Sequence, residues 1–451
     1  MNKVTIRIVG VLLIAMAVFA VGCKKKNKPD AKKAFIKYFG GLKGHNAAEV
    51  LQVTDGGYVI AGTGISGADP GNILVIKTDA EGNEIWNQSI GDATTYDECG
   101  SVAIMPDGGY IVIGTCGYTK DRVWNVNALE VTKDSTAIFA TRLSAFGTII
   151  WSIRYPSPSL SYVKIGTFGK SVVVNDNGEC LLAGMVDSSG VNSSTNIYAF
   201  LIDANGVLLQ RSAVNTIPYI GGATGGSNDN VFNAIRAFGS GLEHEYIIST
   251  STTISGENTP RLVPIRLSGN ALLQNQGVTK TDWLEPTYND AQQISRLSGQ
   301  NYLLVGTKGT PSLSSDIYAI QLSNSGGLSK LNSWTYGDTG AGSIDIGISA
   351  ISTSDGGYAI LGVTNSLLYT KDAAKLNDVL LIKVNSSGVV EWEKVFGGRG
   401  NDSASRLIQT SDGGYVICGT IAFGDDVSNS GNSNAISIIK LNQNGDLTNV
   451  E

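Results

Sequence analysis

One short phrase recurs along this chain and constrains its fold more than any other feature. It reads Asp-Gly-Gly-Tyr, then an apolar run that ends in Gly-Thr, and the clearest copies are residues 55–63, 107–115, 355–362 and 412–420. Weaker copies lie at residues 177–184, 245–248 and 300–307. Aligned on the tyrosine, the copies fall at Tyr58, Tyr110, Cys180, Tyr246, Tyr302, Tyr358 and Tyr415. Because a fixed period of this kind is the signature of a repeat architecture, the chain is expected to hold seven similar units.

Each unit is predicted to form four strands. The first strand precedes the Asp-Gly-Gly turn, whose glycines supply the positive φ that a tight hairpin needs. The second is the apolar run, the third is exemplified by residues 72–77, and a second tight turn leads to a fourth strand. That fourth strand carries an aromatic side chain: Trp86, Trp151, Trp334 or Trp392. Four-stranded antiparallel units repeated in this way are typical of β-propeller blades.

The two ends of the chain are complementary. The seventh unit ends at residues 447–451 without an aromatic fourth strand, whereas residues 35–41 match the fourth-strand segment 392–398. We therefore expect the N-terminal strand to complete the last blade and to cover an edge that would otherwise aggregate. A linear solenoid would need capping units, and the sequence offers none. The predicted fold is an all-β, seven-bladed propeller in a single domain over residues 34–451.

The repeat also resembles known sequences. Residues 77–86 resemble the tryptophan-docking repeat of quinoprotein-like (PQQ-like or WD40-like) propellers. The fuller unit resembles the repeat of uncharacterised Bacteroidetes-type lipoproteins, over about residues 34–451. The resemblance implies the fold, but it rests on turn glycines and packed aromatics and so implies no function. Quinone-dependent enzymes of this kind have eight blades and an adjacent cysteine pair; this sequence has neither, so no cofactor is expected.

The N-terminus is predicted to be a lipoprotein signal. Lys3 and Arg7 precede an apolar run, residues 8–21, that is short for a membrane-spanning helix. The run ends in Ala-Val-Gly before Cys23, which matches the bacterial lipobox. The interpretation is a signal peptide over residues 1–22, a Cys23 that carries palmitate and other acyl chains, and a polar tether over residues 23–33. The alternative is an ordinary secretory signal.

This interpretation also gives a location. A lipidated cysteine predicts attachment to the outer membrane of a bacterial cell envelope. Lysines, rather than acidic residues, follow Cys23. By resemblance to Bacteroidetes-type lipoproteins this favours a periplasmic orientation, and the cell surface stays open as the alternative.

Composition and histidine content exclude several function classes. The net charge is −6 and there is no basic stripe, which argues against nucleic acid as a partner. The chain has two histidines, His45 and His244, too few for a multi-histidine metal centre, and a Ser-His-Asp triad is not indicated. Neither a phosphate-binding loop nor a calcium loop is present. The sequence therefore predicts a protein that is not an enzyme and that holds no metal.

One acidic position recurs in the repeats. An apolar residue lies eight positions before the repeat tyrosine, and five positions earlier come His45, Asp97, Asp345 and Asp402. Asp229 and Asp290 lie in similar loops. Because the first strand of a blade lines the central channel, these side chains could ring one channel mouth and hold a cation. The favoured alternative is that each aspartate accepts hydrogen bonds from backbone N–H groups of its own loop.

The cysteines after Cys23 divide into two kinds. In the second unit, Cys99 and Cys116 lie nearly opposite each other on neighbouring predicted strands. They could form a disulfide in an oxidising compartment, or stay as thiols if the geometry does not fit. Cys180 and Cys418 lie in second strands of different units and are expected to be buried and inert.

The longer connections are predicted to lie on one face of the ring. They are residues 117–135, 215–230, 365–377 and 422–434. Long loops on a rigid scaffold usually carry binding, and aromatic side chains there can stack on sugars or anchor a protein partner. The alternative is that these aromatics fold back over the core. The candidates are Tyr96, Tyr118, Trp124, Tyr219, Trp283, Tyr288 and Tyr369.

These observations lead to one functional hypothesis and two alternatives. The main hypothesis is a non-enzymatic, lipid-anchored scaffold that engages an envelope protein partner through its long-loop face. The first alternative is a glycan-binding surface lipoprotein. The second is a hydrolase or lyase that uses the acidic channel mouth.

Overall fold

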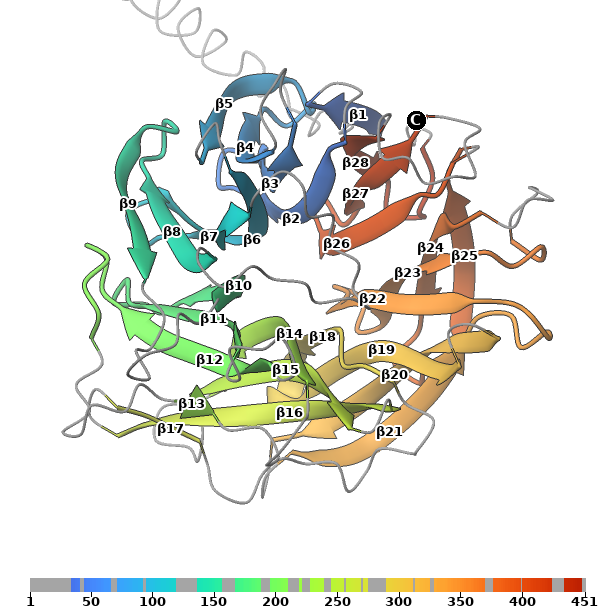
Figure 1. Cartoon of the computed structure of the whole chain (residues 1–451). Helices are drawn as coiled ribbons and strands as arrows, with labels where there is room; N and C mark the ends of the chain where they lie inside the picture. Colours follow the sequence, from blue (N-terminus) through green and yellow to red (C-terminus); the bar gives the residue numbers. More distant parts are fainter. Residues whose placement is uncertain are drawn as a thin grey trace, which may run out of the picture.

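The computed structural model has the architecture that the repeats predict: a ring of β-sheets around a central axis (Figure 1). It describes residues 34–447 except 41–43, 66–70, 92–94, 119–135, 156–166, 188–194, 210–218, 221–227, 239–244, 255–256, 269–270, 275–288, 311–312, 325–327, 370–375, 399 and 424–433. Within that part, the helical structure is one 3-10 turn, η1 (Ser298–Gln300). No helix there is long and apolar enough to cross a membrane. The signal peptide, Cys23 and the tether lie outside the described residues.

Seven four-stranded antiparallel sheets form the blades. Blades 1 to 3 contain β2 (Asn46–Gln52), β3 (Tyr58–Gly64), β4 (Asn72–Thr78) and β5 (Glu84–Ile90); β6 (Tyr96–Ile104), β7 (Tyr110–Tyr118), β8 (Ala137–Leu143) and β9 (Ile149–Tyr155); and β10 (Thr167–Val174), β11 (Cys180–Asp187), β12 (Thr195–Ile202) and β13 (Tyr219–Ile220). Blades 4 and 5 contain β14 (Asn228–Arg236), β15 (Tyr246–Ile254), β16 (Glu257–Ser268) and β17 (Ala271–Gln274); and β18 (Gln293–Arg296), β19 (Tyr302–Thr310), β20 (Ser314–Ser323) and β21 (Ser329–Tyr336). Blades 6 and 7 contain β22 (Asp345–Ser352), β23 (Tyr358–Thr364), β24 (Asp378–Val384) and β25 (Val390–Phe396); and β26 (Ser403–Gln409), β27 (Tyr415–Ala422), β28 (Asn434–Leu441) and β1 (Phe35–Phe39). The predicted seven-bladed fold is confirmed.

Ring closure also occurs as predicted. The N-terminal strand β1 pairs antiparallel with β28, so that Phe35 lies opposite Lys440 and Phe39 opposite Ile436. The seventh blade therefore contains both ends of the described chain (Figure 1). This pairing removes an open edge from the last blade.

The Asp-Gly-Gly turn is held by a cation from the third strand. In blade 1, Gly56 has φ of 86°, and the Asp55 carboxylate accepts a hydrogen bond from Gly57 N at 2.8 Å. The buried Lys77 ammonium lies 2.8 Å from the same carboxylate and also donates to Thr78 O. Other blades repeat the arrangement with the pairs Arg142–Asp107, Lys383–Asp355 and Lys440–Asp412. The repeated aspartate is therefore a structural residue.

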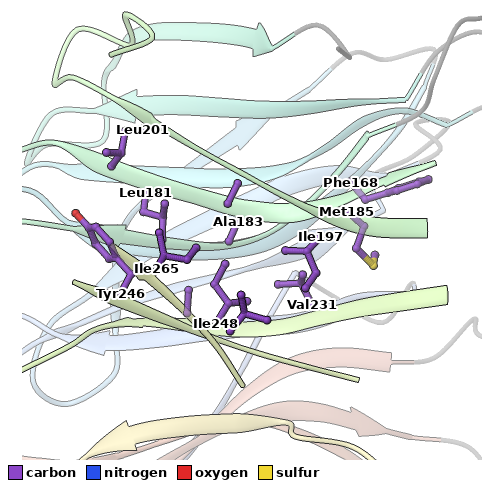
Figure 2. Packing of buried hydrophobic residues seen from close by; sticks show 13 residues of the cluster. Phe168, Leu181, Ala183, Met185, Ile197, Leu201, Val231, Tyr246, Ile248 and Ile265 are labelled. Atoms are coloured by element: carbon purple, nitrogen blue, oxygen red, sulfur yellow. The ribbon is translucent and has the colours of Figure 1, made fainter. Parts of the chain in front are cut away.

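Adjacent blades are joined by apolar side chains. Between blades 3 and 4, residues of β10, β11 and β12 pack against residues of β14, β15 and β16 (Figure 2). In that cluster Tyr246 and Ile248 from blade 4 meet Leu181 and Ala183 from blade 3. A comparable cluster occupies the junction of blades 7 and 1, where Val50 and Ile60 pack with Ile436.

The fourth-strand aromatic docks on the following blade. Trp334 of blade 5 lies 5.9 Å, between ring centroids, from Tyr358 of blade 6, and its indole N–H donates to Ser387 O at 3.0 Å. Phe35 takes this place in blade 7, with its ring centroid 6.3 Å from that of Tyr58 in blade 1. The aromatic side chain that recurs in the sequence thus packs each of these blades against the next one.

The threonine of the Gly-Thr phrase makes a second link between blades. Thr63 Oγ1 accepts a hydrogen bond from Cys99 N, and Thr115 Oγ1 accepts one from Gly169 N. Across the ring closure, Thr420 Oγ1 accepts from Ala47 N. Each of these N–H groups belongs to the inner strand of the following blade, next to a point where that strand is irregular.

Candidate functional site

The inner strands share one irregularity. In β2, β6, β10, β14, β22 and β26, the register with the neighbouring strand shifts by one residue. A β-bulge of this kind kinks a strand and re-aims its side chains. The residues at the six bulges are Ala48, Gly100, Lys170, Phe232, Ile348 and Ser405. The bulges bring side chains of different blades to the same level of the central channel.

A polar cavity of about 120 Å³ lies at this level. Residues of all seven blades line it: Ala48, Glu49, Gly100, Ser101, Lys170, Ser171, Phe232, Asn233, Gln292, Gln293, Ile348, Ser405 and Arg406. We call it the channel pocket. Hydroxyl, amide and charged groups outnumber apolar side chains there, which favours a hydrophilic ligand.

Glu49 is the carboxylate of the channel pocket. It is buried, and its Oε1 lies 2.7 Å from Nε of Arg406, while Oε2 accepts a hydrogen bond from Ser101 Oγ at 3.3 Å. Burial raises the pKa of Glu49, and the nearby Arg406 charge and the hydrogen bonds only partly oppose this effect. A buried carboxyl whose pKa is raised is a candidate for proton transfer.

Two cations line the same pocket. Lys170 Nζ lies 3.1 Å from Oε1 of Glu98, and its side chain is 28% exposed. The Arg406 side chain is 24% exposed and meets Glu49 through Nε. Both cations thus line the pocket, stay partly exposed and pair with a carboxylate.

Asn233 differs from its counterparts in other blades. Just after the bulge, Ser171 Oγ accepts a hydrogen bond from Ala234 N, and Ser349 Oγ accepts one from Leu407 N, each across a blade junction. Gln293 Oε1 likewise accepts from Ala350 N at 2.8 Å. Asn233 is 7% exposed, yet its Oδ1 has no hydrogen-bond partner. The pocket therefore holds a buried acceptor that the fold does not use.

The acidic positions predicted for a channel-mouth cation site serve as backbone acceptors. Asp97 Oδ1 accepts from Gly117 N at 3.1 Å, and Asp345 Oδ2 accepts from Asp338 N at 2.7 Å. The Asp402 carboxylate accepts from Gly398 N and from Ala422 N, both at 2.8 Å. Among the residues with a described position, no group of three or more His, Cys, Asp or Glu side chains could hold a metal ion. These aspartates thus accept hydrogen bonds from backbone N–H groups, but the donors Gly117 and Ala422 belong to the neighbouring strands β7 and β27 rather than to the loop of the aspartate itself.

His45 and two related aspartates occupy similar places. The His45 imidazole is buried next to Gly40 and Gly64, and burial lowers its pKa. Asp290 Oδ1 accepts from Thr307 N at 2.8 Å, and burial raises the pKa of Asp290 to about 6. Burial also raises the pKa of Asp229, which accepts a hydrogen bond from Thr252 Oγ1. None of these residues lines the channel pocket.

Two of the predicted binding aromatics fold back onto the ring. Tyr96 is half-buried over Gly71, and Tyr369 is half-buried with its hydroxyl donating to Glu393 Oε1 at 3.3 Å. Burial raises the pKa of Tyr96 to about 12. Tyr118 is the last residue of β7 and Tyr219 the first of β13, but their side chains lie outside the described part of the chain. The other three candidates lie wholly outside the described residues: Trp124, Trp283 and Tyr288. Binding through the long-loop face stays a prediction.

The predicted disulfide between Cys99 and Cys116 is not formed. Both side chains are buried free thiols, as are those of Cys180 and Cys418. The bulges of β6 place Cys99 opposite Gly114 rather than opposite Cys116. A count of residues back and forward from the hairpin turn does not include these bulges, which is why the sequence suggested closer pairing.

Among known proteins, this chain is similar to solved structures in fold, and no match was found in sequence families. No family model matches the chain, and no curated protein matches it. Among solved structures, a puromycin hydrolase is 11% identical with a TM-score of 0.46, over 84% of this chain and 50% of its own. The periplasmic gluconolactonase of Pseudomonas aeruginosa is 9% identical with a TM-score of 0.44, over 89% of this chain and 97% of its own. The polysaccharide lyase Uly1 is 10% identical with a TM-score of 0.43, over 93% of this chain and 96% of its own.

These similarities correct one prediction. The sequence analysis expected a protein that is not an enzyme, and this expectation is wrong on the comparison, since the similar propellers are named as a hydrolase, a gluconolactonase and a lyase. The prediction relied on the absence of familiar catalytic motifs. At this level of identity the similarity covers the fold alone, so no substrate or reaction is transferred from these proteins to this chain.

Sequence reasoning missed the channel pocket, although a signal for it exists. In six of the seven units, a polar residue lies nine positions before the repeat position, immediately before the apolar residue noted above: Glu49, Ser101, Ser171, Gln293, Ser349 and Arg406. A polar residue that recurs within an otherwise apolar inner strand marks the side of that strand that faces the channel.

Proposed function

We propose that this protein is an enzyme of the hydrolase or lyase type that acts on a small polar substrate in the channel pocket. Glu49 is the proposed proton-transfer residue. The observation that carries the proposal is a buried carboxylate with a raised pKa, 2.7 Å from an arginine, in a polar pocket on the axis of the ring. A titratable group with a perturbed pKa in a pocket marks a candidate active site.

The donor set narrows the reaction. Glycoside hydrolysis usually needs two carboxyl groups on opposite sides of the bond that breaks. Among the described residues that line the pocket, Glu49 supplies the carboxylate and the other charged groups are Lys170 and Arg406. One carboxylate with two cations suits two kinds of chemistry better. In the first, a base activates water against an ester or lactone; in the second, a base removes a proton next to a carboxylate whose developing charge the cations stabilise.

The proposed place of action is the bacterial envelope. This part of the proposal rests on the lipobox that ends at Cys23 and on the polar segment 23–33 that follows it. A lipid anchor with several acyl chains would hold the propeller at the outer membrane. Substrates would then be small molecules of the periplasm or of the cell surface.

A turnover screen tests the proposed function. The purified protein would be offered aldonolactones, aryl esters and uronate disaccharides at neutral pH, with and without a chelator. Opening of a lactone or an ester is measured by the protons that it releases. Elimination is measured by the ultraviolet absorbance of the new double bond. Turnover in any class supports the proposal. A folded protein that turns over no member of the panel would overturn it.

A further inference from the structure

The charges of the channel pocket favour an anionic ligand. Lys170 and Arg406 contribute two positive charges to the lining, and Glu49 contributes one negative charge. The lining residues alone sum to one positive charge when all three groups are ionised, and Glu98, which pairs with Lys170 but does not line the pocket, balances this charge from outside. In a confined site with low-dielectric walls, the two cations that line the pocket attract a negatively charged group.

Arg406 has donors to spare. It contacts Glu49 through Nε, whereas four of the five N–H donors of a guanidinium are on its two terminal nitrogens. These terminal donors match the two oxygens of a carboxylate. A lysine can approach the same carboxylate and acts on it as a point charge. Lys170, from blade 3, lines the same pocket and supplies that second charge.

Asn233 indicates that the ligand also carries a hydrogen-bond donor. Its Oδ1 is the unpartnered acceptor described above, on a side chain more than nine-tenths buried. Leaving a buried polar atom without a hydrogen bond costs about 1–3 kcal/mol. A ligand hydroxyl would satisfy it, as the backbone N–H groups of the next blade satisfy Ser171 and Ser349.

We propose that the channel pocket binds a small hydroxylated carboxylic acid, with its carboxylate at Lys170 and Arg406 and a hydroxyl donating to Asn233 Oδ1. The volume of about 120 Å³ corresponds to roughly four water molecules, which limits the part of the ligand inside the pocket to a few heavy atoms, such as a carboxylate and a neighbouring hydroxyl group. This inference rests on the proposed function, since it names the substrate class of the same site.

Calorimetric titration with D-glucuronate tests the inference, and D-glucose serves as the matched neutral probe. We expect glucuronate to bind at least about tenfold more tightly than glucose, since the two differ by a carboxylate. Lys170→Met and Asn233→Leu should each weaken glucuronate binding by about tenfold or more, whereas Lys330→Met, at an exposed position of β21, should leave it unchanged. Thermal unfolding would check that each variant is folded.

The outcomes separate this inference from the proposed function. Equal affinity for the two probes, no glucuronate binding by the folded protein, or a Lys170→Met variant with unchanged affinity would overturn the inference. Glucuronate binding by a protein that turns nothing over would support the inference and reject the proposed function. Turnover of neutral substrates that glucuronate does not inhibit would reject the inference and leave the proposed function standing.

Discussion

Glu49 of blade 1 and Arg406 of blade 7 form an ion pair of 2.7 Å across the junction where the ring closes. At the same junction, Ser405 Oγ donates to Ala47 O at 2.7 Å. The pairing of β1 with β28 completes the sheet of blade 7 itself. Contacts between the first and last repeats therefore form part of the channel pocket.

The first prediction concerns that closure. Phe35→Ala should lower the free energy of unfolding by about 2 kcal/mol, because it removes the ring that docks on Tyr58 and Gly82 of blade 1. Ile36→Ala, one residue along the same strand and more exposed, should lower it by less than about 1 kcal/mol. Urea unfolding followed by circular dichroism measures both variants. Equal effects would mean that Phe35 does not act as the blade-docking aromatic.

The second prediction concerns the tryptophan contact between blades 5 and 6. Gly388 and Gly356 are turn glycines with φ of 79° and 85°. A Cβ at Gly388 would overlap the Trp334 indole, whereas a Cβ at Gly356 would meet nothing within 4 Å. Gly356→Ala should thus cost about 1 kcal/mol for backbone strain alone, and Gly388→Ala about 1–3 kcal/mol more. Thermal unfolding of the two variants isolates the docking contact, and matching stabilities would exclude it.

The third prediction is a pH dependence. Burial alone would raise the pKa of Asp355, but hydrogen bonds from Lys383, Thr353 and Gly357 outweigh it and lower the pKa from 3.8 to about 2. The stability that this shift supplies is present above pH 3.8 and is lost as the pH falls through about 2. Lys383→Met removes the buried ammonium and should destabilise the protein by about 1–2 kcal/mol at pH 7.

Unfolding in urea at pH 7 and at pH 3 checks this dependence. The difference between wild type and Lys383→Met should shrink at pH 3, because the unfolded carboxyl is then largely protonated. Lys330→Met, at an exposed position, serves as the control with little effect at either pH. A difference that stays constant or grows toward pH 3 would contradict the assignment of Lys383 as the partner of Asp355.

The fourth prediction concerns the N-terminus. Cells that express the full chain and are fed radiolabelled palmitate should incorporate the label, and Cys23→Ser should abolish incorporation. When cells are fractionated, the Cys23→Ser protein should be found in the soluble fraction, whereas the wild-type protein should be found in the membrane fraction. Label that persists in the Cys23→Ser protein would place the lipid elsewhere, and a wild-type protein without label would leave an ordinary secretory signal.

The sequence predicted the fold well because the residues that build it repeat. Turn glycines, docked tryptophans and the Gly-Thr threonines act within one blade or between neighbours, so that each copy reinforces the same pattern. The spacing of Phe35 even predicted how the ring closes. Local patterns of this kind are what single-sequence reasoning detects.

The channel pocket was harder to predict because it is not local. Glu49, Lys170, Asn233 and Arg406 lie in four different repeats and meet only at the axis. Their identities differ between blades, so they appear as variation within the repeat. The bulges that aim them into the channel cannot be counted from hairpin turns, which also misled the pairing of Cys99 with Cys116. The proposed site lies where the repeats diverge.

The most direct test of the channel pocket as an active site is the ratio kcat/KM of Glu49→Gln against wild type, on whichever substrate the turnover screen identifies. Glu84→Gln, an exposed carboxylate on the outer strand β5, is the matched control. The account predicts a loss of about 100-fold or more for Glu49→Gln, in a protein that still unfolds cooperatively, and no change for the control. A Glu49→Gln protein with wild-type kcat/KM would contradict the assignment of Glu49 and move the site away from the centre of the ring.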